Sequence, residues 1–145
     1  MKGKHWFGLI WILVGIALLL SAPPVQASHD TFLAINDVFT ALNSGQVDPA
    51  LAAFAEDATA ANLLRSETYT GLSEIRQMLQ GMQRAGRQFD IVDVEMNGDT
   101  ITASVEVSDA GHVWGTETIE AVIKGGLLQE FTMTNFRLEL WRIGR

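Results

Sequence analysis

Cysteine is absent from the 145 residues of this chain, and histidine occurs only three times. Without cysteine there can be no disulfide framework, thiolate metal site, cysteine nucleophile or lipid-modified cysteine anchor. His5, His29 and His112 do not have the helical or strand spacing of a zinc site. No serine lies in a Gly-x-Ser-x-Gly setting, and Gly125-Gly126 is followed by no helix that would make it a phosphate loop. The sequence therefore predicts no metal and no cofactor.

Basic residues are also few. Ten Lys and Arg stand against 17 Asp and Glu, which gives a formal net charge of −7 at pH 7. An acidic domain lacks the electrostatic footprint that nucleic acid or anionic lipid requires, so no nucleic-acid partner is expected. The excess of acidic residues favours solubility.

The first 27 residues have the pattern of an export signal. Lys2 and Lys4 give a positive start, residues 7–20 form an uninterrupted apolar or glycine run, and small side chains at Val25 and Ala27 suit a signal peptidase. We therefore expect cleavage after Ala27 and an exported (secreted or periplasmic) domain over residues 28–145. The alternative is an uncleaved segment, with residues 7–20 as an N-terminal membrane anchor, although a spanning helix needs about 20 apolar residues. The membrane would then be a partner only through this segment.

The first half of the remaining chain has helical periodicity. Apolar residues three and four apart predict a helix over 30–43 and another over 71–85. Between them, Asp48 is expected to cap a short helix that has Pro49 in its first turn. Residues 55–62 are expected to be irregular or extended.

The second half changes to the two-residue alternation of strands. Asn97-Gly98 is a strong signal for a tight hairpin turn. Helices followed by an antiparallel meander predict an α+β fold, in which three N-terminal helices pack on one face of a curved antiparallel four-stranded sheet. The curl of such a sheet is expected to leave a concave cavity. The four expected strands cover residues 88–96, 100–107, 113–123 and 127–140.

Several local strings resemble one known superfamily. FTALNSGQVDPALAAFAEDATA (39–60), YTGLSEIRQMLQGM (69–82), DVEMNGDTITASVEV and GTETIEAVIKGGLLQEFTMT occur in the order of the SnoaL-like branch of the nuclear transport factor 2-like superfamily. The resemblance covers about residues 32–140. It implies a cone-shaped, cystatin-like α+β domain with a deep apolar pocket, commonly a homodimer through its sheet. Members of the superfamily include ketosteroid isomerases, polyketide cyclases, epoxide hydrolases, dehydratases and non-catalytic binding modules, so the fold does not settle function.

The resemblance also locates catalytic positions, and this chain departs from them. The position of the isomerase base falls at Asn62, whose amide cannot abstract a proton, and the position of the first-helix tyrosine falls at Val38. Asp57 matches an acidic residue of the family that we interpret as structural. A cyclase or epoxide hydrolase would need a late aspartate, and residues 110–145 contain none. A steroid-isomerase mechanism is therefore disfavoured.

Glu117 is the strongest candidate for a catalytic group. Counted by two along its strand, it shares a face with Ile119, Ala121 and Ile123. If that face is the concave one, Glu117 points into the pocket, where burial would raise its pKa toward general acid or base use. The alternative is that Glu117 lies where the strand leaves the core and is solvated.

Other residues are candidates for the ligand pocket. Phe131 and Met133 are expected to be core or pocket wall, and Asn135 on their face either supplies a hydrogen bond to the pocket or ends the strand. Arg65 and Tyr69 precede the third helix, at the expected pocket mouth, where Arg65 is either an anion clamp or a solvated loop residue. The remaining candidates are Asn62 and Trp114, the latter as a ligand, dimer or packing residue.

Two functions follow from these observations. The first is an exported, non-catalytic domain that binds a small hydrophobic molecule or acts as a dimeric interaction module. The second is an enzyme of isomerase, cyclase or dehydratase type with Glu117 as acid or base and Asn62 or Asn135 orienting the substrate.

Overall fold

The computed structural model describes residues 25–139. This part of the chain forms three helices and one six-stranded sheet. The elements are α1 (Val25–Asn43), α2 (Val47–Leu51), β1 (Phe54–Asn62), β2 (Glu67–Thr70), α3 (Gly71–Arg84), β3 (Gln88–Asn97), β4 (Thr100–Asp109), β5 (His112–Lys124) and β6 (Leu127–Leu138).

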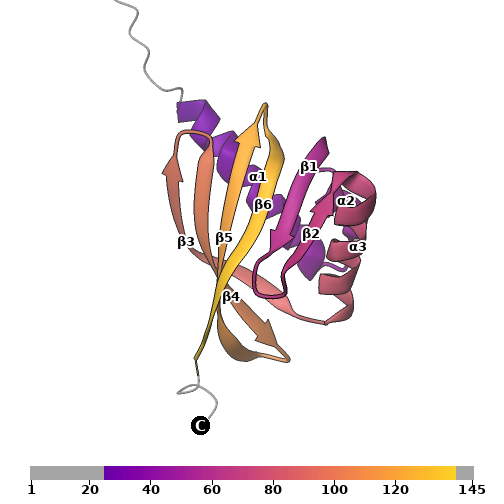
Figure 1. Cartoon of the computed structure of the whole chain (residues 1–145). Helices are drawn as coiled ribbons and strands as arrows, with labels where there is room; N and C mark the ends of the chain where they lie inside the picture. The colour runs from indigo at the N-terminus through magenta and orange to yellow at the C-terminus, as the bar shows by residue number, and fades with distance from the viewer. Residues whose placement is uncertain (1–24, 140–145) are drawn as a thin grey trace, which may run out of the picture.

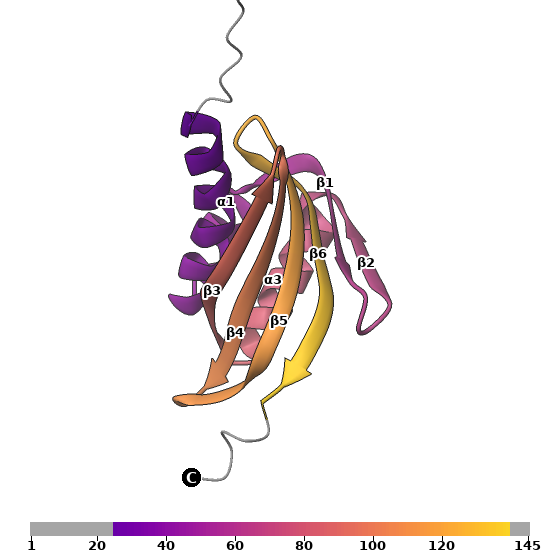
Figure 2. The ribbon, with the colours of Figure 1, turned by 90° about the vertical axis from the view of Figure 1, so that its left-hand side faces the viewer.

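The helices cover one face of a curved sheet (Figure 1). The strand order is β2-β1-β6-β5-β4-β3, with β3 to β6 as an antiparallel meander. Figure 2 shows the long strands bending around the layer that contains α1 and α3. The expected α+β fold, with three helices on a curved sheet, is confirmed.

The sheet differs from the expectation in having six strands instead of four. Residues 55–62, expected to be irregular or extended, belong to β1, which pairs parallel with β6 and antiparallel with β2. The sheet is therefore mixed. β1 was hard to recognise because its register with β6 shifts between Phe54 and Thr59, and the adjacent Glu56 and Asp57 are both exposed. The two-residue alternation that marks a strand is broken there.

The helices follow their sequence signals with one exception. α3 begins at Gly71 as expected, and the Glu74 carboxylate accepts a hydrogen bond from the Thr70 backbone N–H at 2.7 Å. The expected Asp48 cap is wrong, because α2 already begins at Val47 and makes no side-chain cap hydrogen bond. Asp48 instead forms an ion pair with Arg76 of α3, which joins the two helices.

The expected export segment lies almost wholly outside the described residues, which begin at Val25. Residues 25–27, at the end of that segment, form the first turn of α1, which starts five residues before the expected helix. Within residues 25–139, no helix is long and apolar enough to cross a membrane.

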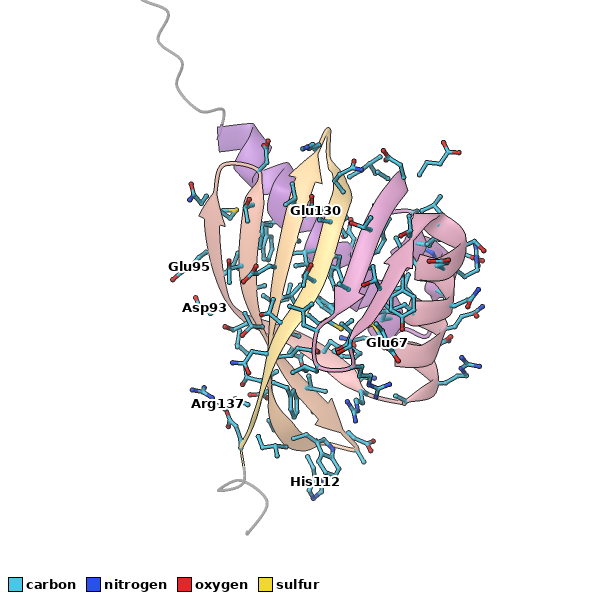
Figure 3. The ribbon with its side chains drawn as sticks, in the orientation of Figure 1. Glu67, Asp93, Glu95, His112, Glu130 and Arg137 are labelled. Atoms are coloured by element: carbon cyan, nitrogen blue, oxygen red, sulfur yellow. The ribbon has the colours of Figure 1, made fainter. Side chains whose placement is uncertain are left out.

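The core lies between the helices and the inner face of the sheet. β4 and β5 alternate strictly between buried and more exposed positions, so each presents one apolar row to the helices. The free edge of the sheet at β3 has features that disfavour pairing with another strand. Its register shifts between Ile91 and Asp93, and Asp93 and Glu95 project outward along it (Figure 3). A shifted, charged edge strand discourages pairing with another chain.

The side chain of Asn43, at the end of α1, forms two hydrogen bonds with the backbone of β3. The Asn43 amide nitrogen donates to the Phe89 carbonyl oxygen at 2.8 Å, and the Phe89 N–H donates to the Asn43 amide oxygen at 2.8 Å. Both bonds are partly buried and span 46 residues of sequence. They satisfy the backbone of β3 next to α1, where β3 has no further strand to pair with.

We therefore expect Asn43→Ala to lower the free energy of unfolding by about 1–3 kcal/mol, because two backbone groups lose their partner. Urea denaturation of the variant and the wild type measures this difference. Ser44→Ala is the matched control, since it removes one exposed hydrogen bond to the Thr40 carbonyl and should cost less than about 0.5 kcal/mol. Equal losses in the two variants would contradict the assigned role of Asn43.

Candidate functional site

A cavity of about 390 Å³ opens between α3, the β1–β2 turn and the inner face of the sheet. Its wall combines apolar side chains from the helix and the strands with polar groups from the turn and from the end of α3. The residues that line it are Asn62, Leu64, Arg65, Glu67, Tyr69, Gln77, Met78, Gly81, Met82, Ala85, Arg87, Phe89, Glu117, Met133 and Phe136.

Glu117 lies on the cavity wall, in the inner row of β5. It is 8 % exposed and is the one buried charged residue in the part of the chain that the structure describes. Burial raises the pKa of its carboxyl group, and the charges of Arg87 and Arg65 act in the opposite direction. Across residues 25–139 the carboxyl has no hydrogen-bond or ion-pair partner. Of the two alternatives, the structure thus places Glu117 on the concave face.

Glu117 has close neighbours on β4, β5 and β6. Phe136 of β6 pairs with Glu117 in the strand register, and Val105 flanks it on β4. Gly115 lies two residues before Glu117 on the same face, and a Cβ atom there would stand 2.9 Å from Phe136 Cζ and 2.3 Å from the Arg137 carbonyl oxygen. Only a residue without a side chain therefore lets β6 and the Phe136 ring lie this close to β5.

The expectation that Asn135 shares a face with Phe131 and Met133 is wrong. Thr118 pairs with Asn135 and Ile119 with Met133, so the intervening Thr134 is an extra residue in β6. One extra residue moves every later side chain to the opposite face. Asn135 is consequently exposed and outside the cavity lining, and Phe136 takes the inward position.

Asn62 and Arg65 both line the cavity, and they are connected. The Arg65 backbone N–H donates to the Asn62 side-chain oxygen at 3.2 Å and to the Asn62 carbonyl at 3.2 Å. Ser66 completes the turn with a φ of 56°, a conformation that is uncommon outside glycine. The Asn62 side chain thus holds the turn that presents Arg65 to the cavity.

Tyr69 and Glu67 form the β2 side of the cavity. The Tyr69 hydroxyl donates to the Glu67 carboxylate at 2.8 Å. This hydrogen bond, burial and the Glu67 charge raise the pKa of Tyr69, while the Arg65 charge opposes them. Figure 3 shows Glu67 at the lower end of β2, level with the C-terminal half of α3. Both groups are therefore engaged with each other at the cavity mouth.

Two further predicted pocket residues lie elsewhere. Phe131 is fully buried in the core, where its ring centroid is 6.2 Å from that of Phe39 and 5.8 Å from that of Phe54. Trp114 is 47 % exposed, and neither residue lines the cavity. The structure brings together Glu117, Asn62, Arg65, Tyr69 and Met133 from the predicted set.

Sequence reasoning missed several lining residues. Met78 and Met82 were recognisable only as the apolar stripe of α3, and a helix stripe does not distinguish core from cavity wall. Phe136 was not recognised as a lining residue because the bulge at Thr134 changes the face on which it lies. Arg87 follows the glycine that ends α3 and carries no motif. In residues 25–139, no three His, Asp or Glu side chains are grouped so that they would hold a metal ion.

Comparison with known proteins identifies the domain type. The profile of the SnoaL-like domain matches residues 35–131. Among solved structures, a proposed polyketide cyclase from Sinorhizobium meliloti is 20 % identical, with 70 % of this chain and 93 % of that chain covered and a TM-score of 0.62. A proposed ketosteroid isomerase from Kribbella flavida is also 20 % identical, with 72 % and 76 % covered and a TM-score of 0.62.

A third structure, a protein of unknown function with a cystatin-like fold from Nostoc punctiforme, is 16 % identical. It covers 80 % of this chain and 95 % of its own, with a TM-score of 0.66. Similarities at these identities establish the fold alone. A sequence comparison with curated proteins found no match. Because the family profile spans about two thirds of the sequence, from Ile35 to Phe131, this chain belongs to the SnoaL-like domain family of the nuclear transport factor 2-like superfamily.

Proposed function

We propose that the domain binds a small, largely apolar molecule in the cavity, in contact with Glu117. The observation that carries this proposal is a buried, unpartnered carboxyl group on the wall of an open cavity. Burying such a group costs free energy, and the next inward residue of β5, Ile119, shows that an apolar side chain fits this row. A costly ionisable group at a cavity is typical of a functional site.

The rest of the lining supports an apolar ligand. Met78, Met82 and Met133 supply three flexible thioether side chains, and Phe89 and Phe136 supply aromatic faces. Methionine adapts its shape to different partners, and aromatic rings add contact area with little loss of conformational freedom. A cavity of this size, in which these apolar side chains stand beside polar and charged groups, has the character of a small-molecule site.

A docking module that binds no ligand receives less support. Such a module would be better served by side chains that fill the space beneath α3. Instead, Phe131 packs into the core beside Phe39 and Phe54, and the space near Met133 and Glu117 stays open.

A catalytic role is the second candidate, and one observation favours it. Burial raises the pKa of Glu117, which brings a glutamate closer to the pH range in which it exchanges protons efficiently. Glu117 would then take a proton from a carbon acid, or give one to an oxygen, as isomerases, cyclases and dehydratases require. Because the Asn62 amide cannot take up a proton and holds the β1–β2 turn, Glu117 would act in place of a base at the Asn62 position.

Export of the domain remains a proposal that rests on residues 1–27. We expect the full chain, expressed in a bacterial host, to leave the cytoplasm and to begin at Ser28 after processing. Fractionation and N-terminal sequencing measure both. Full-length protein in the membrane fraction would instead show the uncleaved anchor, and full-length protein in the cytoplasm would contradict both forms of the proposal.

The binding proposal predicts that apolar ligands raise the melting temperature of the domain and that Glu117→Gln changes their affinity by about tenfold. The measurement is a thermal-shift screen followed by calorimetric titration. Glu120→Gln is the matched control, because Glu120 lies on the same strand but is exposed on the opposite face. Affinities that are identical in the wild type and Glu117→Gln would remove Glu117 from the site. Turnover of a bound ligand that is lost in Glu117→Gln would establish the catalytic role.

Glu117 also predicts a pH dependence of stability. Since burial raises the folded pKa above the unfolded one, the folded state holds its proton longer, and stability falls as the pH rises through that interval. The loss is about 1.4 kcal/mol for every pH unit by which the folded pKa exceeds the unfolded one. Glu117→Gln should therefore match the wild type near pH 4 and exceed its stability at pH 8. Urea unfolding at both pH values tests this, and a difference that does not change with pH would refute it.

A further inference from the structure

Two cationic side chains line the cavity without a partner. Six of the ten Lys and Arg residues of the sequence fall within residues 25–139. One of them, Arg76, is paired with Asp48. Arg65 and Arg87 line the cavity, and within the described residues neither guanidinium group forms an ion pair or a side-chain hydrogen bond. In a chain with 17 acidic residues, partners for arginine are plentiful. Two arginines without an ion pair at one cavity therefore indicate a role for their charge.

Within the described residues, the acidic groups of the cavity form no ion pair with these arginines, although the charges of Arg87 and Arg65 act on Glu117. The titratable and charged groups that line it are Arg65, Glu67, Tyr69, Arg87 and Glu117. Glu67 accepts the hydrogen bond from Tyr69, and Glu117 is buried on β5. When Glu117 is neutral, the lining therefore carries two positive charges and one negative charge.

We propose that the cavity selects small apolar molecules that carry a carboxylate, which Arg65 and Arg87 bind at the mouth while the apolar body contacts α3 and β6. This inference rests on the proposed function, because it names the chemical class of the ligand. A guanidinium group presents a planar set of N–H donors that matches a carboxylate, and it stays charged at any physiological pH.

Both arginines are held by short connections rather than long loops. Arg65 lies in the four-residue turn between β1 and β2, whose backbone is fixed by the Asn62 side chain. Arg87 is the one residue between Gly86, which has a φ of 69°, and the start of β3. The backbone at each position is thus set by neighbouring elements, which lowers the entropy cost of placing the two side chains around a ligand.

Glu117 fits this ligand class on the deeper wall. An ionised Glu117 would repel a carboxylate; burial raises the pKa of Glu117, against the opposite effect of Arg87 and Arg65, and so widens the pH range in which it is neutral. A neutral carboxyl group donates one O–H hydrogen bond, which a ligand oxygen inside the cavity accepts. The exposed arginines at the mouth and the buried acid therefore act on an oxygen-bearing ligand from two sides.

Three probes with the same apolar body test the inference on protein purified after expression of the full chain: 1-naphthoate, 1-naphthamide and 1-naphthylmethylammonium. Calorimetric titration at low salt should show that naphthoate binds about tenfold more tightly than the neutral amide, with the cation weakest. Added salt should weaken the binding of naphthoate more than that of the amide, because exposed charges are screened.

Variants locate the effect. Arg65→Gln and Arg87→Gln should each reduce the affinity for naphthoate by about fivefold to tenfold and leave the amide unchanged, because a charge-assisted hydrogen bond is lost. Arg87→Lys should fall between the wild type and Arg87→Gln, since it keeps the charge but not the planar donor set. Arg84→Gln is the control, because Arg84 lies on the last turn of α3 outside the cavity lining.

The outcomes separate this inference from the function on which it rests. Naphthoate and naphthamide binding equally well, or the cation binding most tightly, would overturn the carboxylate preference and leave ligand binding standing. A preference for naphthoate that persists in both arginine-to-glutamine variants would also overturn it. Failure of all three probes, together with failure of the apolar ligand screen, would overturn both proposals.

Discussion

Four phenylalanine rings join helix α1 to three strands of the curved sheet, β3, β6 and β1. The Phe39 ring of α1 stacks on Phe89 of β3 with centroids 5.5 Å apart and contacts Phe131 of β6 at 6.2 Å. Phe131 in turn meets Phe54 of β1 edge to face at 5.8 Å. One helix side chain is thereby linked to an edge strand and, through β6, to the opposite part of the sheet. Aromatic pairs add about 0.5–1.5 kcal/mol each beyond the area they bury, so this cluster stabilises the packing of α1 against the sheet.

The cavity is a consequence of this arrangement. Phe89 contributes to the ring cluster and also lines the cavity, so the packed core ends where the cavity begins. Beyond it, α3 buries Ile75 and Leu79 in the core and turns Met78 and Met82 toward the cavity, whereas α1 contributes Phe39 and Ile35 to the core. Branched and aromatic side chains pack into a dense core, and methionines tolerate open space and varied contacts. Glu117 lines the same cavity as Met78 and Met82. It is therefore buried beside open space and is not enclosed on all sides by packed apolar side chains.

The sequence predicted well those parts of the fold in which one rule of periodicity holds throughout. α3 has an unbroken stripe, and β4 and β5 alternate without interruption over Ile101 to Val107 and Glu117 to Ile123. For the same reason, counting by two placed Glu117 on one face with Ile119, although it left open whether that face is the concave one. Prediction failed where an extra residue changes the parity, as at Thr134 in β6, and where β1 pairs with a partner far along the chain. A bulge is fixed by the registers of two strands together, so no local pattern within one strand reveals it.

The superfamily resemblance implies a catalytic position at Asn62, and the structure shows what the side chain there contacts. By that resemblance Asn62 stands where an isomerase would have its base, and in this structure its side-chain oxygen accepts a hydrogen bond from the Arg65 backbone N–H. The residue thus supports the conformation of the β1–β2 turn and supplies no base. Its side of the cavity gains a cation from that same turn, and the acid lies across the space on β5, at Glu117. Charge at the cavity is therefore arranged with cations at the mouth and an acid deep on the sheet. A basic carboxylate on β1 would repel an anionic ligand. Here the exposed arginines attract an anionic oxygen, and burial favours the neutral form of Glu117.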